Sequence, residues 1–181
     1  MNYYDLITFF FKVGELKKIK RSGWIRHNIP DPESVADHSF RTAFIAMMFG
    51  DVLKVDKLKL VKMALIHDLG EVVVGDITPY DGVEREEKRR KEEEGIRQLL
   101  EVVPNGIEYM DLWKEYEEQK SEEAIILKNI DKLEMAIQAL EYQGVFPDED
   151  LSEFILEAEK GINIPEMQDL LGEFRKESKN Q

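Results

Sequence analysis

The stretch LVKMALIHDLGEVVVGD, residues 60–76, decides how the rest of the chain is interpreted. An apolar run with helical spacing ends in the adjacent pair His67 and Asp68, and Glu71 follows about one helical turn later. Residues four apart share one face of a helix, so His67 and Glu71 point the same way, whereas Asp68 is turned by about 100°. The stretch therefore predicts a buried helix whose end presents an imidazole and two carboxylates together.

Outward from this stretch, apolar residues recur at intervals of three and four, and strand-like alternation is rare. The first helical segment has its apolar stripe over residues 6–16 and is predicted to end at Gly23. Further helices are predicted over residues 34–51, 56–67, 84–101, 107–119, 121–142 and 149–160, with a short one after Pro165. GEVVVGDITPYDG, residues 70–82, is predicted to be an ordered loop.

The chain length favours a single core, because 181 residues are enough for one and short for two. We find no internal repeat and no low-complexity linker. The sequence therefore predicts one all-α domain over residues 1–181, a helical bundle with a polar C-terminal tail at residues 176–181.

Composition excludes several classes of function. The net charge of −13 argues against a broad nucleic-acid surface, because phosphate backbones need clustered cations. The absence of cysteine rules out disulfides, a thiol nucleophile and thiolate metal sites. The N-terminus does not resemble a secretory signal, and the apolar runs are too short to span a bilayer. We therefore expect a cytoplasmic protein that binds neither membrane nor nucleic acid.

One basic segment, KKIKRSGWIR at residues 17–26, interrupts this acidity with five cations and no acid. Such an island can mark the docking place of a small anion, or it can be a solvated loop. Within it, the Arg21 guanidinium suits bidentate phosphate recognition. Trp24 could pack against a sugar or base, or it could simply pack the loop onto the bundle.

Two further residues can complete a metal site with His67 and Asp68. His38 lies in the first turns of its predicted helix, where a histidine is commonly structural. Asp131 lies in an apolar helix, where it could bind a metal, pair with a nearby lysine or face water. Together the four supply two imidazoles and two carboxylates from three helices, a donor set that suits a divalent ion of Mn, Fe, Co, Ni or Zn.

Three segments resemble the HD-domain metal-dependent phosphohydrolases, and in particular the branch that holds the 5′-deoxynucleotidases. They are PESVADHS at 32–39, IHDLGEVVVGDITP at 66–79 and KNIDKLEMAIQALEY at 128–142. They contain the H…HD…D signature of the superfamily and the longer HDxxExxxGDITP pattern, which is more specific. The resemblance covers roughly residues 5–160 and implies the helical fold of the HD domain.

The resemblance also assigns site residues. The metal ligands of the family match His38, His67, Asp68 and Asp131. Acidic residues that act in catalysis, or hold a second cation beside the phosphate, match Glu71 and Asp76. Residues that line the substrate pocket match Ile77, Thr78 and Pro79, and those that meet the substrate phosphate and sugar match Arg21 and Trp24. In the bacterial nucleotidases the last two are adjacent, whereas here Ser22 and Gly23 stand between them.

The histidine count limits the kind of metal centre. Of the three histidines, only His27 remains outside the predicted ligand set, which argues against a histidine-rich dinuclear centre. We expect one tightly bound transition metal and a weaker second ion, such as Mg, held by Glu71 and Asp76.

The resemblance implies hydrolysis of nucleoside 5′-monophosphates, especially deoxynucleotides, to nucleosides and phosphate. Two alternatives stay open from the sequence: an HD phosphohydrolase for a nucleoside triphosphate, an alarmone or another phosphate ester, and a non-catalytic, metal-stabilised helical module. The branch is often dimeric, so we expect a homodimer. The Phe-rich first helix or the helix at 121–142 could form its interface, or both stripes could be buried within one chain.

Overall fold

The computed structural model describes residues 2–178, and within this range it contains helices, turns and one isolated β-bridge between Lys20 and Ser34. The helices are α1 (Tyr3–Glu15), α2 (Ser22–Arg26), α3 (Val35–Leu53), α4 (Lys57–Ile66), α5 (Glu71–Val74), the 3-10 helix η1 (Pro79–Asp81), α6 (Arg85–Leu100), α7 (Gly106–Glu117), α8 (Glu122–Val145), α9 (Ser152–Gly161) and α10 (Pro165–Ser178). The predicted all-α class is confirmed.

Three helices, α3, α4 and α8, form the frame that carries the predicted metal ligands, and each begins at a side-chain cap. Ser34 caps α3 in a reciprocal capping box with Asp37, Asp56 caps α4, and Ser121 caps α8. Each cap satisfies a free backbone N–H at the helix start and stabilises the helix by about 1 kcal/mol. The helices that must be placed accurately therefore have well-defined starting points.

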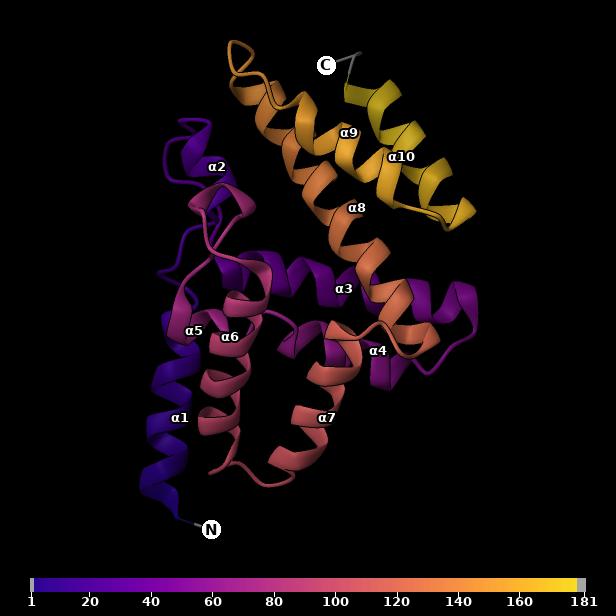
Figure 1. Cartoon of the computed structure of the whole chain (residues 1–181). Helices are drawn as coiled ribbons and strands as arrows, with labels where there is room; N and C mark the ends of the chain where they lie inside the picture. Colours follow the sequence, from indigo (N-terminus) through magenta and orange to yellow (C-terminus); the bar gives the residue numbers. More distant parts are fainter. Residues whose placement is uncertain (1, 179–181) are drawn as a thin grey trace.

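The main hydrophobic core lies where α3 packs against α4 and α8. Leu60 and Met63 of α4 and Leu127, Ile130 and Leu133 of α8 are completely buried in it. Helices α9 and α10 pack against α8, and α7 packs against α4, α6 and α8, with α6 and α7 on the side of α3 away from α9 and α10 (Figure 1). None of the described helices combines the length and the apolar character needed to cross a bilayer.

Helix α5 corrects the prediction of a loop at residues 70–82, which is wrong for residues 71–74. Val72, Val73 and Val74 have β-branched side chains that favour extended structure, yet they form one helical turn. Packing provides the reason: a Cβ added at Gly95 of α6 would lie 2.8 Å from Cβ of Val73, so the missing side chain lets the two elements approach closely. Tertiary contact here overrides local preference.

The N-terminal segment also differs from its prediction. Helix α1 ends at Glu15, and Gly23 lies inside the separate helix α2 rather than ending the first segment. Trp24 gives α2 its anchor, because its side chain is buried against Ile29 and Phe154. At the other end of the chain, residues 176–178 of the predicted polar tail belong to α10, which continues through Ser178, and residues 179–181 lie outside the described part.

Candidate metal centre and active site

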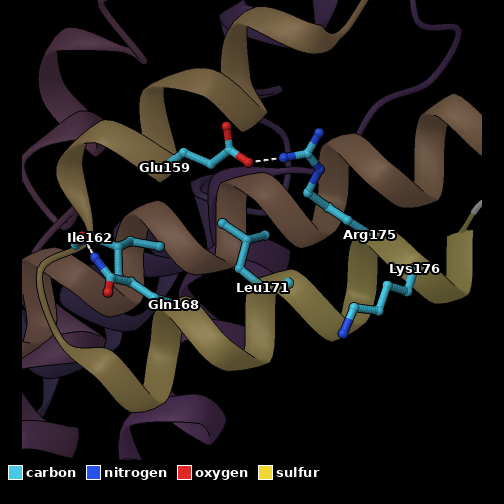
Figure 2. Close-up of a pocket in the computed structure, with 7 residues that line it drawn as sticks. Glu159, Ile162, Gln168, Leu171, Arg175 and Lys176 are labelled. Carbon is cyan, nitrogen blue, oxygen red and sulfur yellow. Dashed lines mark hydrogen bonds and ion pairs between the residues drawn. The ribbon is translucent and has the colours of Figure 1, made fainter.

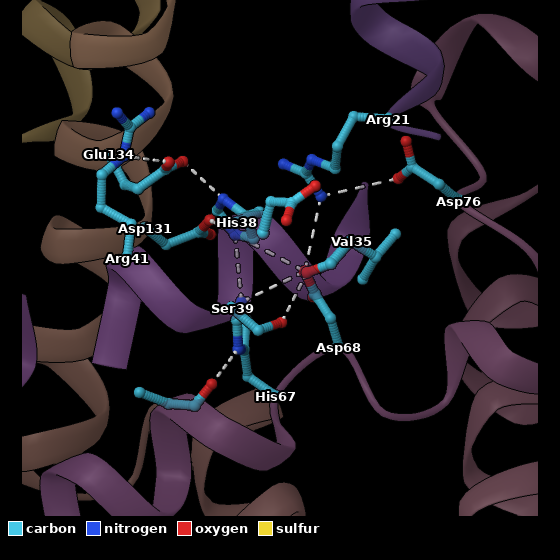
Figure 3. A network of polar contacts seen from close by, with 12 residues as sticks. Arg21, Val35, His38, Ser39, Arg41, His67, Asp68, Asp76, Asp131 and Glu134 are labelled. Atoms are coloured by element: carbon cyan, nitrogen blue, oxygen red, sulfur yellow. Dashed lines mark hydrogen bonds and ion pairs between the residues drawn. The ribbon is translucent and has the colours of Figure 1, made fainter. Parts of the chain in front are cut away.

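Four side chains from α3, α8 and the end of α4 converge on one point (Figure 3). His38 Nε2 lies 3.4 Å from His67 Nε2 and 3.3 Å from Asp131 Oδ1. Asp68 Oδ2 lies 3.2 Å from His67 Nε2 and 3.6 Å from His38 Nε2. The structure therefore brings together all four residues that the sequence predicts as metal ligands.

The ring nitrogens that face away from the centre, Nδ1 of His38 and of His67, indicate the tautomer of each imidazole. His67 Nδ1 lies 2.7 Å from the carbonyl oxygen of Ala64, and His38 Nδ1 lies 2.5 Å from Oε2 of Glu134. Both partners are acceptors, so each Nδ1 carries a proton, and a neutral ring then points the lone pair of Nε2 inward. Two imidazole lone pairs and two carboxylate oxygens face one another, an arrangement that fits a divalent cation.

The electrostatics of the centre also favour a bound positive charge. Burial and the nearby Arg21 lower the pKa of His38, but Glu134 and Asp131 outweigh them and raise it to about 10. Burial would raise the pKa of Asp68, yet His67, Arg21 and His38 bring it below its usual range. The carboxylates around His38 therefore favour a positive charge at this point, which a divalent cation can supply.

Asp131 resolves the alternatives that the sequence left open. Its Oδ2 accepts hydrogen bonds from Lys128 Nζ at 2.9 Å and from the Tyr116 hydroxyl at 3.2 Å, while Oδ1 faces His38. Pairing with a lysine and orientation toward the metal centre therefore occur together. Burial would raise the pKa of Asp131, but Lys128 and His38 hold it well below its usual range, so the carboxylate is ionised.

A cation and a further carboxylate stand at the edge of the centre. Arg21 Nη1 lies 3.4 Å from Asp68 Oδ2 and 3.6 Å from Asp76 Oδ1. Gly75 has a φ of +77°, which turns the chain back after α5, and the Ser22 backbone N–H donates to Asp76 Oδ2 at 2.5 Å. Two segments far apart in the sequence are thus joined, with a guanidinium between two carboxylates.

Glu71 is the unusual acid of this group. Its side chain is buried, and its Oε2 has no hydrogen-bond partner among the described residues. Burial, followed by the charges of Asp68 and Asp76, raises the pKa of Glu71 well above its ordinary value. Two neighbouring carboxyl groups, Glu71 and Asp68, thus have pKa values pushed in opposite directions, a pattern found in acid–base catalysis.

Trp24 is predicted to contact the substrate, but its side chain is buried in a hydrophobic cluster with Ile29 and Phe154. Its ring packs against Phe154 and Tyr142, with centroid distances of 4.3 and 5.3 Å, and only 2% of the residue is exposed. Its Nε1–H donates to Glu33 Oε1 at 2.8 Å. In this structure Trp24 therefore packs its segment onto the helical bundle, which is the second of the two alternatives that the sequence left open.

Two of the residues predicted to line the substrate pocket, Ile77 and Thr78, form hydrogen bonds that stabilise the loop after Asp76. The Thr78 hydroxyl donates to Asp81 Oδ2 at 2.8 Å, and the carbonyl oxygen of Ile77 accepts from Lys88 Nζ at 2.7 Å. Pro79 begins η1, and its side chain lies outside the described part of the structure. These contacts hold the loop that follows Asp76.

Two acids beside the centre, Glu134 and Glu33, escaped the sequence analysis. Glu134 is completely buried and contacts His38, and its position three residues after Asp131 on one helix face was a usable signal. Glu33 lies beside them, and burial together with Glu134 raises its pKa to about 7. No sequence pattern identified Glu33, because its position depends on how α8 packs against the chain before α3.

Two surface cavities lie away from the centre. One of about 490 Å³ is formed by α10 and the end of α9 (Figure 2). Its lining residues are Glu159, Ile162, Gln168, Leu171, Gly172, Arg175 and Lys176. The other, of about 450 Å³, lies between α1, α5 and α6. Neither is lined by a predicted site residue.

Comparison with known proteins agrees with this geometry. The family model described as HD domain matches residues 13–177. The chain belongs to the HD-domain family. Relatives within the family include the 5′-deoxynucleotidase HDDC2 of Homo sapiens, 39% identical over 96% of this chain and 86% of the human protein. The mouse (Mus musculus) 5′-deoxynucleotidase HDDC2 is 43% identical over 77% of this chain and 71% of its own length.

Solved structures show the same HD-domain architecture. A conserved hypothetical protein from Pyrococcus furiosus superposes with a TM-score of 0.78 and 35% identity, covering 94% of this chain and 99% of that structure. The family, its helical fold and the divalent metal that HD phosphohydrolases use therefore agree with the sequence predictions.

Proposed function

We propose that this HD-domain protein is a metal-dependent 5′-deoxynucleotidase, which hydrolyses deoxynucleoside 5′-monophosphates to nucleosides and phosphate. The convergence of four nitrogen and oxygen donor atoms beside Arg21 and the buried Glu71 carries this proposal. The names of the human and mouse relatives support the choice of substrate class.

His38, His67, Asp68 and Asp131 would hold the metal, which we propose to be Co, Mn, Ni, Fe or Zn, in keeping with nitrogen and carboxylate ligands. When bound, such an ion lowers the pKa of a coordinated water and supplies a nucleophile near neutral pH.

The remaining residues bind the phosphate and move protons. Arg21 would neutralise charge on the phosphoryl oxygens, because the surrounding carboxylates outweigh the effect of burial and keep it a cation at the edge of the centre. Glu71 would orient the attacking water and exchange a proton with it. Asp76 would protonate the leaving oxygen or, with Glu71, hold a weaker second ion such as Mg. Trp24, Ile77, Thr78 and Pro79 stay predicted substrate residues.

Phosphate release from a panel of nucleotides tests the proposal. The metal-loaded protein should release phosphate from deoxynucleoside 5′-monophosphates and should leave nucleoside triphosphates intact. Turnover of triphosphates, alarmones or non-nucleotide esters alone would favour another HD phosphohydrolase. Metal binding without release of phosphate from any ester would favour the non-catalytic module.

Arg21→Met should lower kcat/KM for a deoxynucleoside monophosphate by about 10²-fold, because the variant loses the partly buried cation proposed to bind the phosphate. Arg26→Met is the matched control from the same basic segment. Arg26 lies 3.9 Å from the Tyr80 ring centroid and pairs with Glu153, so its variant should keep most of the kcat/KM. Steady-state kinetics that show equal losses for both variants would contradict a phosphate contact by Arg21.

We also propose that the protein is a homodimer, with α3 as the interface. Phe40, Phe44, Met47 and Met48 lie on one face of α3 and are 70%, 52%, 40% and 57% exposed. A contiguous apolar face of this kind is unusual on a monomer, and a twofold axis can pair it with itself. Most apolar side chains of α8 are buried in the core, whereas α1 buries none and stays a second possible interface.

Phe44→Glu should convert the dimer to a monomer in sedimentation velocity, because the new charge would be buried against its own copy. Phe11→Glu, an equally large change on the exposed face of α1, should leave the dimer intact. The reverse pattern would place the interface on α1.

Two other expectations stay predictions. The family match over residues 13–177 supports a single HD domain over the chain. The cytoplasmic location and the lack of nucleic-acid and membrane partners rest on composition.

A further inference from the structure

Besides Asp131, helix α8 carries a buried carboxylate, Glu134, that the proposed reaction does not use. Glu134 follows Asp131 by three residues, so both project from one face of α8 toward α3. The Glu134 side chain is completely buried. A buried carboxylate is costly unless it is paired and hydrogen-bonded, so its contacts indicate what it does.

Both oxygens of Glu134 are occupied. Oε2 lies 2.5 Å from Nδ1 of His38, and Oε1 accepts a hydrogen bond from Arg41 Nε at 2.8 Å. Arg41 is itself held along α8 by Gln138 at 2.5 Å and by Glu141 at 2.8 Å. The carboxylate therefore cannot rotate away from the imidazole without breaking a network of charged hydrogen bonds.

This contact determines which nitrogen of His38 can bind a metal. The Arg41 guanidinium is always a cation, and its pairing with Oε1 at 2.8 Å holds Glu134 as an ionised, accepting carboxylate. An ionised carboxylate only accepts hydrogen bonds, so the proton of a neutral His38 must sit on Nδ1. The lone pair of Nε2 then faces His67 Nε2 and Asp131 Oδ1.

We infer that Glu134 is a positioning residue, which selects the tautomer and ring orientation of His38 that bind a divalent cation. The inference rests on the metal centre of the proposed function. His67 obtains the same orientation from the backbone carbonyl of Ala64, which no side-chain substitution removes. Glu134 is therefore the partner through which metal affinity can be changed without touching a ligand.

Calorimetric titration of chelator-treated protein with Co²⁺ tests the inference. Glu134→Gln should weaken Co²⁺ binding by about 10- to 100-fold, because the amide N–H₂ can donate to Nδ1 and stabilise the opposite tautomer. Glu141→Gln is the matched control, since Glu141 lies on the same helix and contacts Arg41 but not His38. It should bind Co²⁺ like the native protein.

A second measurement needs no variant. In the Zn²⁺-loaded native protein, nitrogen-15 spectra of the imidazoles should show a protonated Nδ1 and a metal-bound Nε2 for His38. Equal Co²⁺ affinity of a folded Glu134→Gln, or metal bound through Nδ1, would overturn the positioning role alone. Failure of the native protein to bind any divalent ion would overturn the proposed function as well.

Discussion

Glu71→Gln should lower turnover of a deoxynucleoside monophosphate by about 10²- to 10⁴-fold, the range typical of a lost general acid or base. The amide has nearly the same shape as the carboxyl group but cannot exchange a proton with water. Glu71 lies outside the four converging atoms of His38, His67, Asp68 and Asp131, so the variant should still bind the metal. Phosphate release and metal titration on the same preparation measure the two properties separately.

The same variant should change how stability depends on pH. In the folded, metal-free protein, burial and neighbouring charges raise the pKa of Glu71 above its ordinary value of 4.5. The folded state therefore binds this proton more tightly than the unfolded chain, and stability is lost as pH rises above that ordinary value. Glutamine stays neutral, so Glu71→Gln should lose less unfolding free energy than the native protein as pH rises.

Glu92→Gln is the control for Glu71. Glu92 lies on α6, and burial raises its pKa to about 7, but it has no proposed part in the reaction. Its variant should keep native turnover. If Glu71→Gln retained most of its activity, or if both variants lost activity equally, the catalytic role of Glu71 would be abandoned.

His67→Ala should abolish activity, with a loss of at least about 10³-fold, because several kcal/mol of transition-state stabilisation depend on the bound metal. The alanine removes one of four converging donors and the hydrogen bond to the Ala64 carbonyl. Adding metal at about 100 times its dissociation constant should raise the unfolding free energy of the native protein by about 2.7 kcal/mol. His67→Ala should show no such increase.

The chain offers a matched control, because His27 is its single histidine outside the proposed ligand set. His27 Nε2 lies 2.7 Å from Glu153 Oε1, at the junction of α2 and α9. His27→Ala should keep both the activity and the stabilisation by metal in thermal unfolding experiments. A metal response that survives in His67→Ala but disappears in His27→Ala would move the centre to another part of the molecule.

Much of this protein can be predicted from local pattern. Helical periodicity identifies the long helices, because an apolar stripe recurs every three or four residues whatever lies opposite it. Caps such as Ser34, Asp56 and Ser121 mark their starts by contacts within a few residues. The motif around His67 and Asp68 can be recognised for the same reason, since its spacing is contained in one short stretch.

The sequence by itself therefore determined the helical class, the resemblance to the HD-domain family and the four residues predicted to meet at one metal site. Only the tertiary structure decided which atoms face one another, that Trp24 is packed inside, and that Glu134 holds His38. It also folded the valines after Glu71 into a helical turn against Gly95. These features depend on the packing of helices far apart along the chain, and side-chain spacing within one helix carries no information about its partner.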